Sequence, residues 1–250
     1  MATDTKVFGG RPHALTDAPF TYCPGCTHGI SHRLIAEVLD ELGVEGRAIA
    51  IAPVGCSVLA YEFFNCDGIQ AAHGRAPAVA CAVARTHPDA VVFTYQGDGD
   101  LASIGAAEMV HAATRGDNIV IIFINNAIYG MTGGQLAPTS LLGQVTQTSP
   151  YGREVARDGH PIRVVEMLST LEGVALAQRV ALDTPAHIRE AKRAIKRAFE
   201  NQIAGKGFSI VELLSTCPTN WGLSPADSFT WLQENLLPYY PLGVYKEIDK

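Results

Sequence analysis

The 250-residue sequence has few cysteines, no long apolar run and no excess of positive charge, and each shortage excludes a class of protein. Six cysteines are too few for a disulfide scaffold of this length, so we expect reduced thiols that are available to metals. No apolar run approaches the roughly 20 residues that span a bilayer. The net charge of −6 argues against nucleic-acid binding and against contact with anionic membranes. We therefore expect a cytoplasmic protein that acts on small molecules.

Short apolar runs alternate with helix-length segments, which predicts an α/β fold with a mostly parallel sheet and helices on both faces. Three nearly continuous apolar runs have the pattern of strands buried on both faces: Ala48–Ile51, Ala90–Tyr95 and Ile119–Ile124. The later alternation comprises a strand, a helix and a strand: Ala177–Leu182, Ala186–Ile203 and Phe208–Leu214.

Between the second and third runs, the segment Leu101–Arg115 predicts a helix that Gly116 ends. The segment Tyr129–His160 is a long irregular stretch of a kind that usually serves function. No repeat or linker divides the chain. We expect one domain over residues 1–250, with a cysteine-bearing N-terminal extension and a C-terminal extension.

Two polar motifs follow neighbouring predicted strands at one edge of the sheet: Gly97-Asp98-Gly99-Asp100 and Asn125-Asn126. Ligands bind at the carboxyl ends of parallel strands, so Asp98 and Asn126 can converge on one ion. Carboxylate, amide and diphosphate oxygens suit magnesium, and a helix that begins near Asp100 favours an anion. The alternative is a turn and a loop that merely connect strands. A dinucleotide-binding loop is excluded because no G-x-G-x-x-G is present.

Four cysteines lie near the N-terminus or directly after predicted strands: Cys23, Cys26, Cys56 and Cys217. The strand ends could lie at the same edge as the polar motifs, so these thiols could gather around one inorganic group. Four thiolates suit either zinc or a [4Fe–4S] cluster. The spacing alone leaves a redox dithiol, zinc and a cluster open.

The combination CPGC…GCS…HGR…GDGD…NN…YGMTGGQ…TCPTNW resembles the β subunits of 2-oxoacid:ferredoxin oxidoreductases over nearly the whole chain. Its GDG…NN part resembles the thiamine-diphosphate motif of transketolase-like, decarboxylase and oxidoreductase enzymes. The resemblance implies a thiamine-diphosphate-binding fold in which Asp98 and Asn126 bind Mg²⁺ through their side chains and Ile128 binds it through its carbonyl. It also implies a [4Fe–4S] cluster on the same four cysteines.

The resemblance further implies a set of residues around the cofactor: Gly55, Cys56, Ser57, Gly97, Asp98, Gly99, Asp100, Asn126, Ile128, Gly130 and Thr132. His73, in a His-Gly-Arg segment, is the candidate catalytic residue, although a structural histidine fits the sequence equally well. One departure is Thr27, which stands where members often have Gly and removes no ligand.

The implied reaction converts a 2-oxoacid and coenzyme A into acyl-CoA and CO₂ and reduces ferredoxin, with 2-oxoglutarate or a branched-chain 2-oxoacid as the substrate. Family members take the glutamate that activates thiamine from an α subunit, so we expect an α partner and leave γ and δ subunits open. A non-redox thiamine decarboxylase or synthase subunit is a rival, and the cysteines count against it. A zinc-stabilised scaffold is another, and the intact Asp98 and Asn126 count against that one.

One further group of residues forms a basic face on the predicted helix: Arg189, Lys192, Arg193, Lys196 and Arg197. Such a face could meet an acidic ferredoxin or the phosphates of coenzyme A. We favour a solvated face, because charged helix faces usually mean only that.

Overall fold

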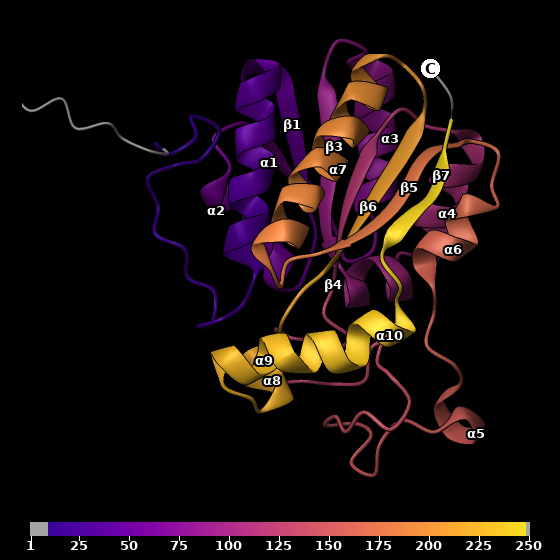
Figure 1. The fold of residues 1–250 in the computed structure, drawn as a ribbon. Helices are drawn as coiled ribbons and strands as arrows, with labels where there is room; N and C mark the ends of the chain where they lie inside the picture. The colour runs from indigo at the N-terminus through magenta and orange to yellow at the C-terminus, as the bar shows by residue number, and fades with distance from the viewer. Residues whose placement is uncertain (1–9, 249–250) are drawn as a thin grey trace, which may run out of the picture.

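The computed structural model describes residues 10–248, which form a seven-stranded sheet in the order β2-β1-β3-β4-β6-β5-β7 (Figure 1). The strands are β1 (Ala48–Ala52), β2 (Asp67–Gln70), β3 (Val91–Gly97), β4 (Val120–Asn125), β5 (Val174–Ala181), β6 (Phe208–Leu214) and β7 (Gly243–Glu247). All neighbouring strands are parallel except β5 and β7. The mostly parallel α/β fold that the sequence predicts is confirmed.

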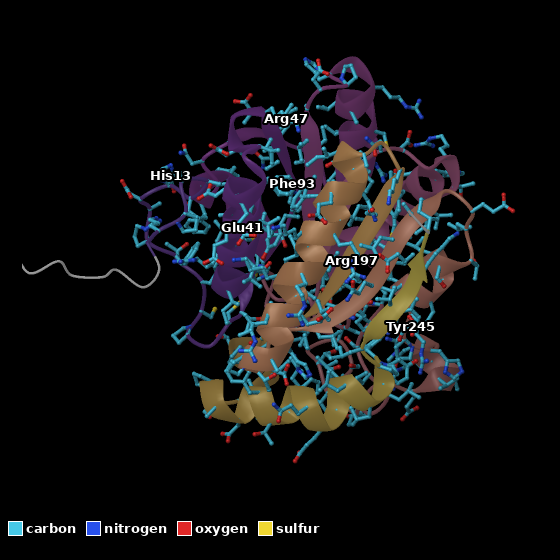
Figure 2. All side chains as sticks on the ribbon, turned by 45° about the horizontal axis from the view of Figure 1, so that its top comes forward. His13, Glu41, Arg47, Phe93, Arg197 and Tyr245 are labelled. Atoms are coloured by element: carbon cyan, nitrogen blue, oxygen red, sulfur yellow. The ribbon has the colours of Figure 1, made fainter. Side chains whose placement is uncertain are left out.

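Helices cover both faces of the sheet, and this burial explains why the central strands β3 and β4 are apolar on both sides. One face carries α1 (His28–Leu42) and α7 (Pro185–Ile203), and the other carries α3 (Ala76–Thr86), α4 (Ala106–Arg115) and α6 (Val164–Ser169) (Figure 1). Successive strand residues point to opposite faces, so Phe93 lies in the α1/α7 core while Val92 lies in the other core. Figure 2 shows Phe93 among the side chains that fill the first of these layers.

The C-terminal helices lie across the carboxyl edge of the sheet (Figure 1). These are α8 (Pro218–Trp221), α9 (Pro225–Trp231), η4 (Leu232–Leu236) and α10 (Leu237–Tyr239). A third apolar cluster joins them to the loop after β4: Leu232, Leu236 and Tyr240 pack with Ala127 and Leu141. The C-terminal segment therefore supports the loop that carries the second polar motif.

The remaining short helices are η1 (Glu45–Arg47), η2 (Cys56–Leu59), α2 (Ala60–Phe63), η3 (Asp100–Ile104) and α5 (Val155–Asp158). Apart from α5, the long segment over residues 129–160 has no helix or named strand, as the sequence predicts. No helix in the described part of the chain has the length and apolarity needed to cross a membrane.

The helix predicted over Leu101–Arg115 is instead two elements, a π-helical turn, η3, followed by α4. The break lies at Gly105, which packs so closely on Gly74 that a Cβ atom there would lie 2.8 Å from the Gly74 carbonyl oxygen. The predicted end at Gly116 is confirmed, since that residue has a left-handed φ of 64°. The helix predicted over Ala186–Ile203 begins one residue earlier.

The basic face of α7 contacts carboxylates of its neighbours. Lys192 pairs with Glu37 and Glu41 of α1, and Lys196 also pairs with Glu41. Arg197 pairs with Glu247 of β7. These partly exposed ion pairs link α7 to α1 and β7. The sequence analysis, which favoured a solvated face, did not predict them.

Candidate functional site

A pocket of about 140 Å³ lies where β1, β3 and β4 end. It is lined by His28, Val54, Gly55, Cys56, Ser57, His73, Gly97, Asp98, Gly99, Asp100, Asn126, Ile128, Tyr129, Gly130, Met131 and Thr132. Every residue that the sequence predicts at the cofactor, and the candidate His73, thus lines one cavity. Sequence reasoning missed His28, Val54, Tyr129 and Met131.

The carboxyl group of Asp98 is buried and faces the loop after β4. Its Oδ2 accepts hydrogen bonds from Thr139 Oγ1 (2.7 Å) and from the Ile128 N–H (3.2 Å), and its Oδ1 accepts one from the Gly99 N–H (2.9 Å). Burial raises the pKa of Asp98 to about 6, although these hydrogen bonds oppose the shift. A bound cation would favour the charged carboxylate in this position.

Asn126 meets Asp98 at the same backbone group. Its Oδ1 also accepts from the Ile128 N–H (3.3 Å), so an amide oxygen and a carboxylate oxygen converge on one point. The indole N–H of Trp221 donates to the Asn126 carbonyl oxygen (3.1 Å) and ties the C-terminal segment to this turn. The arrangement presents the hard oxygen atoms that Mg²⁺ prefers.

His73 is held against the pocket by Asp100. The two side chains are 2.5 Å apart, between His73 Nδ1 and Asp100 Oδ1. The buried Asp100 carboxylate also accepts from the Gly74 N–H (2.8 Å) and from Gln96 Nε2 (2.5 Å). Because all these hydrogen bonds come from within the chain, Asp100 serves mainly to orient His73 through Nδ1. The His73 side chain is half-exposed, and its Nε2 remains available to a ligand.

Gly99 has no room for a side chain. A Cβ atom there would lie 2.1 Å from Cε1 of Tyr129, so only glycine allows the loop after β3 to pack against the loop after β4. This close approach brings the two polar motifs into one pocket.

A second cavity of about 370 Å³ adjoins the first and is lined by Cys23, Cys26, Cys56 and Cys217. Cys56 lines both cavities, so the two share a wall. Cys56 Sγ and Cys217 Sγ flank Gly130, at 3.4 and 3.5 Å from where its Cβ would be. Within residues 10–248 no three His, Cys, Asp or Glu residues form a group that could hold a single metal ion.

Two thiols of the cysteine cavity are shielded from water. Burial, together with the neighbouring thiols, raises the pKa of Cys26 to about 12 and that of Cys56 to about 11. Asn220 Nδ2 donates to Cys217 Sγ (3.3 Å). Thiolates in such a cavity require a positively charged group to bind.

Comparisons with known proteins agree with this geometry. Residues 53–213 match the family of thiamine pyrophosphate enzymes, C-terminal TPP binding domain. The 2-oxoglutarate synthase subunit KorB of Methanocaldococcus jannaschii is 35% identical over 223 residues, which are 87% of this chain and 78% of that protein. The chain belongs to the thiamine-diphosphate-binding subunits of the 2-oxoacid:ferredoxin oxidoreductase family.

Two other members of this family are similar over most of the chain. The ketoisovalerate oxidoreductase subunit VorA of Methanothermobacter thermautotrophicus is 50% identical over 226 residues, 90% of this chain and 47% of VorA, so the chain spans about half the length of that relative. A solved 2-oxoglutarate:ferredoxin oxidoreductase from Magnetococcus marinus, with 2-oxoglutarate, coenzyme A and succinyl-CoA bound, superposes with a TM-score of 0.79 at 25% identity, over 98% of this chain and 88% of that one.

The pocket suits the thiamine diphosphate of the family. Ser57 Oγ is buried and has no hydrogen-bond partner among the described residues, so this wall of the pocket offers a free donor. Asp98 and Asn126 offer oxygen atoms at the other motif. The donor set therefore fits a diphosphate with its cation.

Two buried histidines beside the cysteines also escaped the sequence analysis. His28 Nδ1 lies 2.6 Å from the Tyr95 hydroxyl, and His32 Nε2 lies 2.7 Å from the Tyr22 hydroxyl. Burial lowers the pKa of His28 to about 4, so the ring is neutral. The sequence signal that could have found them is their spacing of four residues, which places His28 and His32 on the same face of a helix.

The other two cysteines lie apart from both cavities. Cys81 lies on the buried face of α3, in the core, and Cys66 is half-buried beside the other core. They provide natural controls for experiments on the other four.

Proposed function

We propose that this chain carries the thiamine diphosphate and a [4Fe–4S] cluster of a 2-oxoacid:ferredoxin oxidoreductase. The reaction converts a 2-oxoacid and coenzyme A into acyl-CoA and CO₂ and reduces ferredoxin. The observation that carries the proposal is the shared wall at Cys56 between the thiamine pocket and the four-cysteine cavity. A redox enzyme needs this adjacency, because electrons must leave the reacting centre.

In this proposal Asp98 and Asn126 hold Mg²⁺ through their side chains, with the Ile128 carbonyl as a third ligand. Ser57 and the backbone of Gly55 and Cys56 contact the cofactor from the opposite wall. Further contacts come from Gly97, Gly99, Asp100, Gly130 and Thr132. When bound, thiamine diphosphate supplies an electron sink for decarboxylation.

His73 is the proposed catalytic residue. Its Nδ1 is held by Asp100, so Nε2 is the atom that can exchange a proton or a hydrogen bond with a ligand.

Cys23, Cys26, Cys56 and Cys217 hold the cluster in this proposal. Its support is a cavity large enough for a group of several atoms and four sulfur atoms lining it. When bound, such a cluster would supply a one-electron exit towards ferredoxin.

We further propose that the chain forms one cofactor domain and acts in the cytoplasm with an α subunit. The partner would supply the carboxylate that activates thiamine. The exposed apolar side chains of Met131, Val145 and Tyr151, all on the long loop after β4, support a protein contact beside the pocket.

A branched-chain 2-oxoacid is the substrate that we favour over 2-oxoglutarate. The support is the name of VorA, a ketoisovalerate oxidoreductase subunit, at 50% identity, against 35% for the 2-oxoglutarate synthase subunit. Rates with 3-methyl-2-oxobutanoate and 2-oxoglutarate, measured on the co-purified complex, test this choice. A higher kcat/KM for 2-oxoglutarate would reverse it.

The reaction is tested by anaerobic purification of the chain with its co-purifying partners, followed by iron, sulfide and zinc analysis. About four iron and four sulfide per chain are expected, with an EPR signal of a reduced cluster after addition of a 2-oxoacid and coenzyme A. Cys217→Ser should lose the cluster, whereas Cys66→Ser should retain it. Zinc without iron, or CO₂ release without ferredoxin reduction, would refute the redox proposal.

A further inference from the structure

Asn125 is buried at the end of β4 and connects the candidate metal turn to the interior. Its side-chain Oδ1 accepts a hydrogen bond from the Ala127 N–H (3.1 Å). Its Nδ2 donates to Oε1 of Glu212 on β6 (2.6 Å). Neither Asn125 nor Glu212 lines the thiamine pocket, so a direct contact with the cofactor does not account for this linkage.

The turn that Asn125 supports has an unfavourable backbone conformation. Ala127 has a φ of 58°, and within residues 10–248 it is the one residue other than glycine with a positive φ. A Cβ atom makes this left-handed conformation costly, so it persists only where surrounding contacts impose it. Besides Asn125, the hydroxyl of Ser140 (2.6 Å) and Nε2 of Gln144 (2.9 Å) donate to the Ala127 carbonyl oxygen.

The turn sets the position of the oxygen atoms at the candidate metal site. Ala127 lies between Asn126 and Ile128, and the Ile128 N–H is where the side chains of Asn126 and Asp98 meet. An extended backbone at Ala127 would turn Ile128 away from Asp98. The left-handed conformation is therefore part of the site.

Glu212 is itself fixed by a buried ion pair. Arg179 Nε donates to Glu212 Oε2 (2.8 Å), and both side chains are fully buried. The far side of the Arg179 guanidinium contacts Glu166 of α6, at 3.0 Å between Nη1 and Oε1. Burial of a charged pair is costly unless its hydrogen bonds are satisfied, so this cluster resists displacement.

We propose that Asn125 and Glu212 are positioning residues that hold the turn at Ala127 in the geometry required by the cation and diphosphate. The proposal rests on the proposed function, because it presumes that Asp98 and Asn126 bind a cation. The hydrogen bond from Asn125 offsets the cost of the left-handed alanine before the cofactor arrives. Without it, part of the binding free energy of the cofactor would be spent on forming the turn.

The test uses the full chain with its co-purifying partners and measures binding of Mn²⁺ in the presence of thiamine diphosphate, by the EPR signal of free Mn²⁺. Asn125→Ala should raise the apparent dissociation constant about tenfold, as expected for loss of a hydrogen bond to a buried group. Ala127→Gly, added to Asn125→Ala, should restore affinity to within about threefold of Ala127→Gly alone. Glycine adopts the left-handed conformation without support.

A matched pair of variants separates Glu212 from its ion pair. Glu212→Gln and Glu166→Gln each remove one carboxylate from Arg179, but only Glu212 touches Asn125. We expect Glu212→Gln to weaken Mn²⁺ binding and Glu166→Gln to leave it unchanged. At saturating cofactor, kcat should stay within about twofold of the parent while the KM for thiamine diphosphate rises, since a positioning residue acts on assembly of the site.

The outcomes distinguish this inference from the proposed function. The proposed function predicts that the parent complex binds Mn²⁺ and that Asp98→Ala abolishes this binding. If either result is not obtained, the proposed function fails. If the parent binds Mn²⁺ and Asn125→Ala binds it equally well, the positioning role is refuted. Weakened binding that glycine at position 127 does not restore would also refute it, because the defect would then be a general loss of structure.

Discussion

The carboxyl group of Asp98 is only 3% exposed, and its neighbours are a hydroxyl and backbone N–H groups. Such surroundings stabilise the carboxylate less than water does, so the pKa of Asp98 is raised to about 6. A group whose folded pKa is raised stabilises the fold at low pH, and this contribution is lost as the pH rises through the folded pKa. The metal-free protein at neutral pH is therefore less stable than the same protein would be with an uncharged side chain at position 98.

We expect the stability of Asp98→Asn relative to the parent to increase with pH in the absence of Mg²⁺ and cofactor. Between pH 5 and 7.5 the difference in the free energy of unfolding should change by about 1.4 kcal/mol in favour of the variant. Denaturant unfolding at several pH values measures it. The control is the same comparison with saturating Mg²⁺ and thiamine diphosphate, where the parent should gain most at neutral pH. A difference that does not change with pH would contradict the raised pKa.

Site residues could be predicted from the sequence where a short motif marks them. The Gly-Asp-Gly and Asn-Asn motifs, Cys56 and Cys217 could be placed at one edge, because each follows a predicted strand. Cys23 and Cys26 follow none, and only the resemblance to the family grouped them with the others. The support behind them could not be predicted. Glu212 contacts Asn125 across 87 positions of sequence, and such a pairing leaves no pattern in either segment.

At the scale of elements, the break between η3 and α4 is the feature that shapes the pocket. A continuous helix from Asp100 would be expected from its composition, but the backbone of Gly105 lies against the backbone of Gly74. This contact places His73 beside Asp100. Glycine at position 105 is what allows the segment that carries His73 to pack this closely, because a Cβ atom there would overlap backbone atoms.

We expect Gly105→Ala to destabilise the protein by about 1–3 kcal/mol, because the added methyl group would overlap backbone atoms that cannot rotate away. It should also raise the KM for thiamine diphosphate by displacing His73 and Asp100. Gly46→Ala is the matched control, since nothing lies within 4 Å of a Cβ atom there. Thermal unfolding and steady-state kinetics measure the two effects, and equal behaviour of the two variants would show that the close approach is unimportant.

The elements differ in how far the sequence predicts them, and burial explains the difference. Strands β3, β4 and β6 are buried on both faces and were predicted to within about two residues of their ends. Strand β2 is exposed throughout and has no apolar pattern, so nothing in its sequence marks it. Helix α1 was not predicted, although Thr27 stands at its N-cap position and Gly43 ends it in the left-handed conformation.

At the scale of the whole molecule, the cysteine cavity joins two segments that lie far apart in the sequence. Thr27 Oγ1 lies 2.6 Å from Ser215 Oγ, and both residues are buried. Thr216 Oγ1 donates to the Gly25 carbonyl oxygen (2.7 Å). Through these contacts the Thr27 hydroxyl fastens the N-terminal cysteine loop to the end of β6.

We expect Thr27→Val to lower the free energy of unfolding by about 1–3 kcal/mol, because it leaves the buried Ser215 hydroxyl without its partner. If the chain carries the proposed cluster, its iron should also become easier to remove with a chelator, since Cys23 and Cys26 would be less firmly held near Cys217. Thr86→Val, at an exposed helix position, is the control and should change neither quantity. Iron release at an unchanged rate in Thr27→Val would contradict a fastening role.

The contact between Thr27 and Ser215 spans 188 positions of sequence, and it also sets an order of events in the cell. While the ribosome is still translating the segments before β6, three of the four cysteines are already made but their cavity does not yet exist. An inorganic group delivered at that stage would find at most three of its four thiols. Complete loading of the proposed cluster must therefore follow synthesis of Cys217, so the cluster would be acquired by the nearly finished polypeptide.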